Sequence, residues 1–128
     1  MTRYLLDASV SFALLGGEQT VLGKLAQLET HQVALSAIVW SEALAVAGQD
    51  GRLRENLDLC QKNLDILPFH RASAEAYGAL LEAVAPKKRR ILDRMVAAQA
   101  LEAGLTLVTL TPEIFEDIRG LTIASWAS

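Results

Sequence analysis

Short apolar runs alternate with longer stretches of helical pattern along this chain, and the alternation limits the folds that it can adopt. The runs are bounded by polar residues or proline and read as buried strands. Strands that alternate with helices pair in parallel through right-handed crossovers. We therefore predict an α/β fold, a three-layer α/β/α sandwich with a central parallel sheet of four to five strands. The predicted strands are residues 4–6, 32–35, 64–68, 105–109 and 121–123.

The chain has 128 residues, which is enough for one domain with a substantial core, so residues 1–128 are predicted to form a single domain. Hydrophobic residues make up 52% and charged residues 21%, a globular composition. No apolar stretch predicts a signal peptide or a membrane span, and we expect no membrane partner. A lone cysteine, Cys60, favours a reducing cytoplasmic location. A net charge of −3 argues against general coating of nucleic acid but leaves a nuclease open.

Three acidic residues are candidates for one site. Asp7 follows the first predicted strand, at the sheet edge where open parallel sheets bind ligands, and Ser9 is placed to cap the next helix. Glu42 is the only charged residue between positions 33 and 47, within a predicted helix over 37–47, so it either shares an apolar stripe or turns to water beside Ser41. Asp93 begins a predicted helix over 91–103, where it is either a simple N-terminal acid or a member of the site.

If these acids converge, they require protons or a cation. Two unit charges about 4 Å apart repel by roughly 4 kcal/mol at an effective dielectric constant near 20. A set of carboxylates without histidine or thiolate suits Mg²⁺ or Mn²⁺. Such a site is typical of metal-assisted hydrolysis of a phosphodiester.

One basic run, Lys87-Lys88-Arg89-Arg90, interrupts the helical pattern before Asp93. It is either a solvated loop or a contact surface for phosphate. The chain contains no nucleotide-binding glycine motif, no zinc-protease motif and no nucleophile elbow, so those classes lack support.

Five stretches of the chain form an ordered set of motifs. They are the opening Leu5-Leu6-Asp7-Ala8-Ser9-Val10, residues 35–42 (LSAIVWSE), residues 93–100 (DRMVAAQA), residues 107–109 (LVT) and Leu121 to Trp126. In this order they resemble the first and second motifs of PIN domains, the helix with their third acid, the strand before the fourth and the usual ending. The set covers nearly the whole chain, and the length best fits the VapC-like toxins of bacterial toxin–antitoxin pairs.

The resemblance implies a Mg²⁺- or Mn²⁺-dependent endoribonuclease, a VapB-like antitoxin partner, an RNA substrate and a homodimer. It implies that Asp7, Glu42 and Asp93 are the metal-binding acids, with Ser9 as the small polar residue beside the first. Where the family commonly has a fourth acid or amide this chain has Thr111, so Thr111 or Glu113 is the auxiliary candidate. The RNA-contacting candidates are Lys87, Lys88, Arg89, Arg90 and Arg94.

Two alternatives remain at this point. The missing fourth acid favours a catalytically weak PIN-fold protein that acts by binding a protein partner or RNA. A phosphoryl-accepting aspartate domain is a further alternative, because Asp7 ends a strand, but no paired acid lies near Asp7 in the sequence.

Overall fold

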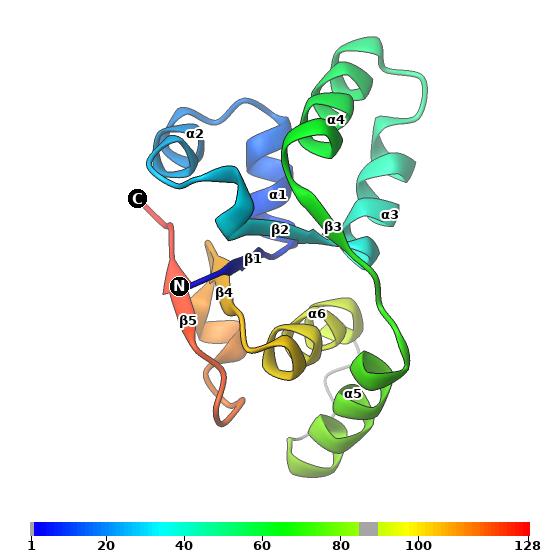
Figure 1. Ribbon diagram of the computed structural model, residues 1–128, viewed down its shortest axis with the longest axis vertical. Helices are drawn as coiled ribbons and strands as arrows, with labels where there is room; N and C mark the ends of the chain where they lie inside the picture. The colour runs from blue at the N-terminus through cyan, green and yellow to red at the C-terminus, as the bar shows by residue number, and fades with distance from the viewer. Residues whose placement is uncertain (1, 85–89) are drawn as a thin grey trace.

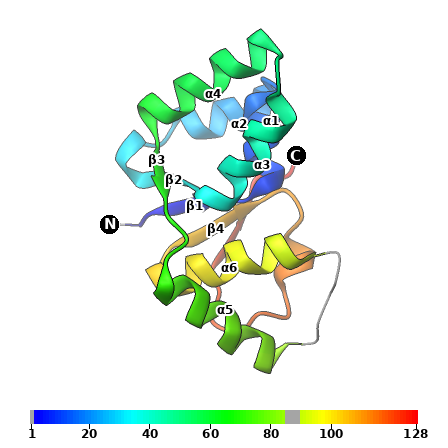
Figure 2. The same ribbon diagram turned by 90° about the vertical axis from the view of Figure 1, so that its right-hand side faces the viewer.

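The computed structural model describes residues 2–84 and 90–128, and within these ranges a five-stranded parallel sheet lies between two groups of helices (Figures 1 and 2). The strands are β1 (Tyr4–Leu6), β2 (Val33–Ser36), β3 (Asp65–Leu67), β4 (Thr106–Thr109) and β5 (Ile123–Ser125). The helices are α1 (Ala8–Leu15), α2 (Gln19–Ala26), α3 (Ala37–Ala47), α4 (Gly51–Asn63), α5 (Arg71–Ala83) and α6 (Ile91–Ala103), with short 3₁₀ turns η1 (Thr30–Gln32) and η3 (Pro112–Phe115).

The strand order is β3-β2-β1-β4-β5 and every neighbouring pair is parallel, which confirms the predicted α/β/α sandwich. Figures 1 and 2 show α1 to α4 on one side of the sheet and α5 and α6 on the other. The chain winds outward from β1 through β2 and β3, and then returns to add β4 on the opposite side of β1. The direction of winding therefore reverses between β1 and β4, and ligands bind in open α/β sheets at such a reversal, outside the carboxyl ends of the strands.

Alternation along β1 explains why both faces of the sheet are covered. Leu5 packs with α6 in one core cluster, whereas Leu6 packs with Val10 of α1 in another, and both leucines are fully buried. Successive strand residues point to opposite faces, so each face needs its own helical layer. A leucine buried in this way contributes roughly 1.5–3 kcal/mol to stability.

The predicted helices over 37–47 and 91–103 are confirmed. Helix α2 stops at Ala26, and Glu29 starts a separate turn, η1, in which its N–H donates to Gln32 Oε1 at 3.0 Å. The last strand lies at 123–125 and not at 121–123. The chain first turns at Gly120 (φ 85°), which places Thr122 just before the strand, where its carbonyl accepts from the N–H of Leu107.

Candidate functional site

Asp7 lies directly after β1, at the reversal point of the sheet, and is only 1% exposed. Its backbone N–H donates to Val108 O at 2.9 Å, which extends the pairing of β1 with β4 up to this residue. Its carboxylate is the N-cap of α1, accepting from Val10 N at 2.9 Å. The expectation that Ser9 caps this helix was therefore wrong, because Asp7 already satisfies the free N–H.

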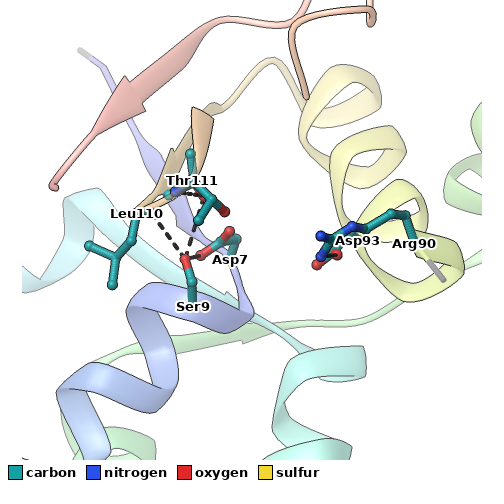
Figure 3. Close-up of polar contacts among 7 residues, drawn as sticks. Asp7, Ser9, Arg90, Asp93, Leu110 and Thr111 are labelled. Carbon is teal, nitrogen blue, oxygen red and sulfur yellow. Dashed lines mark hydrogen bonds and ion pairs between the residues drawn. The ribbon is translucent and has the colours of Figure 1, made fainter. Parts of the chain in front are cut away.

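Ser9 instead connects Asp7 to the end of β4. Its hydroxyl donates to Asp7 Oδ1 at 2.6 Å and accepts from the backbone N–H of Leu110 at 3.0 Å. The same hydroxyl lies 3.4 Å from Thr109 Oγ1, which in turn accepts from the N–H of Thr111 at 3.0 Å. Figure 3 shows Asp7, Ser9 and Thr111 grouped at this edge of the sheet. The hydroxyls hold the carboxylate in one position.

Burial raises the pKa of the Asp7 carboxyl above its ordinary value. Hydrogen bonds from Ser9, Thr109 and the N–H of Val10 oppose that shift, and repulsion from Asp93 adds to it. Asp93 therefore lies near enough to Asp7 for their charges to interact, although they are far apart in the sequence.

Glu42 lies on α3 and is partly buried. Burial raises the pKa of its carboxyl, and the charge of Asp93 raises it further. Asp93 lies in the first turn of α6 and acts electrostatically on both other acids. Asp7 follows β1, Glu42 lies on α3 and Asp93 lies on α6, and the charge of Asp93 acts on both others.

Carboxylate oxygens are hard donors of the kind that Mg²⁺ and Mn²⁺ take, so the donor chemistry of these acids fits a divalent ion. Within residues 2–84 and 90–128, however, no three histidine, cysteine or carboxylate side chains already stand close enough together to hold a metal ion. Asp93 is instead paired with Arg90, whose Nη1 lies 3.4 Å from Asp93 Oδ2. Figure 3 shows both side chains projecting from α6 on the side of Asp7.

Comparisons with known proteins identify the family of this chain. A family model for the PIN domain matches residues 4–121. The chain belongs to the PIN domain family. Among curated proteins it is similar to the tRNA(fMet)-specific endonuclease VapC of Shigella flexneri, with 22% identity over 132 positions that span 99% of this chain and 100% of the relative.

Solved structures share the fold of this PIN domain over its length. A DNA-bound VapBC of Salmonella typhimurium has a TM-score of 0.81 at 24% identity, covering 99% of this chain and 100% of that one. VapBC2 of Rickettsia felis, bound to a promoter DNA fragment, has a TM-score of 0.83 at 22% identity, covering 98% and 99%.

The two auxiliary candidates of this PIN domain, Thr111 and Glu113, have different environments. Thr111 Oγ1 lies 3.4 Å from Thr109 Oγ1, close to the group around Asp7. Glu113 lies on η3 and is exposed. Of the two auxiliary candidates, Thr111 is the one that the hydrogen bonds join to the site.

The basic candidates have different environments. Arg90 is about half exposed beside Asp93, whereas Arg94 is 2% exposed and donates through both Nη atoms to the two oxygens of Asp117, each at 2.8 Å. The expectation that Arg94 contacts RNA conflicts with this burial, because the guanidinium is enclosed and paired. Lys87, Lys88 and Arg89 lie outside the described residues.

Sequence reasoning missed Thr109 and Asp117. Thr109 ends β4 next to the strand that Asp7 follows, so the end-of-strand rule that selected Asp7 also selects it. Asp117 gave no such signal, because its pairing with Arg94 spans 23 positions of the chain and depends on how η3 returns toward α6.

Proposed function

We propose that this PIN domain is a metal-dependent endoribonuclease toxin that a small antitoxin neutralises. The observation that carries the proposal is the position of Asp7 at the reversal point of the sheet, where the charge of Asp93 acts on it as it also acts on Glu42. Carboxylates in such proximity are stabilised by a cation. The similarity to a VapC endonuclease and to VapBC structures supports the same conclusion.

In this proposal, Asp7, Glu42 and Asp93 would hold Mg²⁺ or Mn²⁺. The bound ion would supply polarisation of a phosphate oxygen and a water of lowered pKa. Asp7 is positioned before any ion arrives, because Ser9 and the N–H of Val10 orient Oδ1. Arg90 remains the described candidate for contact with the RNA backbone, since it is partly exposed beside Asp93.

Cleavage of a panel of structured RNAs, tRNAs included, tests the proposed ribonuclease activity. The unaltered protein is expected to cut with Mg²⁺ or Mn²⁺ and to stop with EDTA, and Asp7→Asn is expected to lower the rate by roughly a hundredfold or more. The matched control is Asp58→Asn, which makes the same change at an exposed position of α4. Equal rates for Asp7→Asn and the unaltered protein contradict the proposal.

The second candidate is a catalytically weak PIN-fold protein that acts by binding. It is favoured by Thr111, which stands where the family commonly has an acid or amide. An RNA panel that the protein binds tightly but does not cut, with Asp7→Asn binding equally well, supports this second function.

The antitoxin is proposed to dock between α2 and α4. Here an apolar groove of about 230 Å³ includes Leu22, Leu25 and Leu59, and Leu59 is 58% exposed. An amphipathic helix with an apolar face fits such a groove.

Purification of the protein from its native host, with a search for a small co-purifying protein, tests the dock. Leu59→Glu is expected to weaken the complex by about tenfold or more, because it places a charge in an apolar contact. Val46→Glu is the control, since Val46 is 65% exposed on α3 and does not line the groove. Equal loss with both variants, or with neither, contradicts this position of the dock.

No helix within the described ranges has the length and apolar character needed to cross a membrane. We place the protein in the cytoplasm, where RNA is available and Cys60 stays reduced. Formation of a homodimer stays a prediction.

A further inference from the structure

The carboxylate of Asp93 is paired with a positively charged side chain of the same protein, Arg90. Arg90 Nη1 lies 3.4 Å from Asp93 Oδ2, one helical turn before it at the start of α6. Arg90 is the residue at the N-cap position of α6, yet no side-chain hydrogen bond caps the helix there. Its guanidinium extends to the acid site, so its role lies in pairing with Asp93 and not in capping.

Arg90 also changes the charge balance of the site. Asp7, Glu42 and Asp93 carry three negative charges when ionised, and Arg90 brings one positive charge against the acid that the other two share. Arg94, the next arginine of α6, cannot take this part, because it is buried and occupied by Asp117.

We propose that Arg90 is an internal counter-ion of the acid site, which a divalent metal ion must displace from Asp93 in order to bind. The inference rests on the proposed metal-dependent function and adds a control on metal affinity. Among the described residues no three carboxylates stand close enough together to hold a metal ion before one binds. Asp93 has one oxygen engaged by Arg90, and release of that oxygen frees it for a metal.

The pair is exposed enough to be exchanged. The side chains of Arg90 and Asp93 are 47% and 21% exposed, and an ion pair at this exposure is weak and screened by salt. A divalent cation has twice the charge of the guanidinium and interacts with all three acids, so it outcompetes Arg90 at sufficient concentration.

Binding of Mn²⁺ alone, measured by calorimetry and by the loss of the free-ion electron paramagnetic resonance signal, tests the inference without RNA. Arg90→Gln is expected to tighten Mn²⁺ binding by about two- to fivefold at low salt, with the gain shrinking as ionic strength rises. The control is Arg71→Gln, which removes the same charge from an exposed pair with Glu75 on α5. It is expected to leave the affinity unchanged.

A double-variant cycle identifies the contact. In an Asp93→Asn background, Arg90→Gln is expected to give less than half of its effect on Mn²⁺ affinity, because its partner is gone. Arg90→Ala serves as a second substitution, and circular dichroism confirms folding for each variant. Unchanged or weaker Mn²⁺ binding in both Arg90 variants overturns the inference, and so does an equal gain in Arg71→Gln.

These outcomes are separable from failure of the nuclease proposal. Saturable Mn²⁺ binding that Asp7→Asn weakens, together with no effect of Arg90, overturns only the counter-ion. An unaltered protein that binds no Mn²⁺ overturns both proposals.

Discussion

The two sides of the acid site are built differently. On the sheet side, Asp7 is buried and receives hydrogen bonds from Ser9 and from a backbone N–H, within a network that reaches the end of β4. On the helix side, Asp93 is partly exposed and paired with Arg90 through one long contact. Asp7 is therefore fixed before a ligand arrives, whereas Asp93 is free to exchange partners. In the proposed metal site, such a division would provide one rigid ligand and one adjustable ligand.

The strongest contrast on the helix side is between its two arginines. Arg94→Met is expected to lower the free energy of unfolding by about 2–3 kcal/mol, because it removes two charge-assisted hydrogen bonds to Asp117 from a buried position. Arg90→Gln is expected to change it by about 0.5 kcal/mol or less, as for other exposed pairs. Urea denaturation of both variants measures the difference, and similar losses in the two contradict it.

On the sheet side, Ser9→Ala is expected to cost about 1–2 kcal/mol of stability and roughly tenfold in RNA cleavage. The substitution leaves Asp7 without its 2.6 Å donor and the partly buried N–H of Leu110 without its acceptor. The control is Ser125→Ala, since Ser125 is exposed and accepts one bond from Ala127 N at 3.3 Å. If stability and cleavage survive Ser9→Ala as they survive the control, Asp7 does not depend on the hydroxyl.

Asp7, on the sheet side of the site, also makes the stability of the protein depend on pH. Because the pKa of Asp7 is raised in the folded state, the folded chain binds this proton more tightly than the unfolded chain. The Asp7 carboxylate therefore lowers stability as the pH rises from its ordinary pKa of 3.8 through the raised value. Asp7→Asn mimics the protonated form, so it is expected to be more stable than the unaltered protein at pH 7, with the gap closing toward pH 4.

The pKa of Glu18 is shifted in the opposite direction from that of Asp7, so Glu18 serves as the control. Urea denaturation in EDTA measures the stability of both variants across this pH range. Backbone N–H groups of Thr20 and Val21 lower the pKa of this N-cap carboxyl below its ordinary 4.5. Its stabilisation is present above pH 4.5 and is lost as the pH falls through the lowered pKa. The unaltered protein should therefore lose stability relative to Glu18→Gln on acidification. A gap for Asp7→Asn that widens on acidification contradicts the expected burial effect.

The sequence predicted most of the fold because the strands and helices carry strong local patterns. The helix over 91–103 has an acidic residue, Asp93, in its first turn and ends at Gly104 in a left-handed conformation, both local signals. Asp7 and Asp93 were selected as strand-end and helix-start residues and Glu42 as the lone charge within its helix, and their role as metal-binding acids stays a prediction. Their hydrogen-bond and ion-pair partners gave no such local signal. Which arginine of α6 turns outward and which is buried depends on the position of Asp117, and that position is set by tertiary packing.

The smallest expected effect on RNA cleavage is that of substituting Thr111, an auxiliary candidate for the site. Its hydroxyl has one described contact, to Thr109 Oγ1 at 3.4 Å, whereas its backbone N–H makes the shorter bond, at 3.0 Å, which any residue keeps. Thr111→Val preserves the shape and removes the hydroxyl, so cleavage is expected to change by about threefold or less. Glu113→Gln, on the exposed η3, is expected to match it. A loss with Thr111→Val as large as that with Ser9→Ala would show that the hydroxyl acts in place of the missing acid, and the site would then be rigid at two positions instead of one.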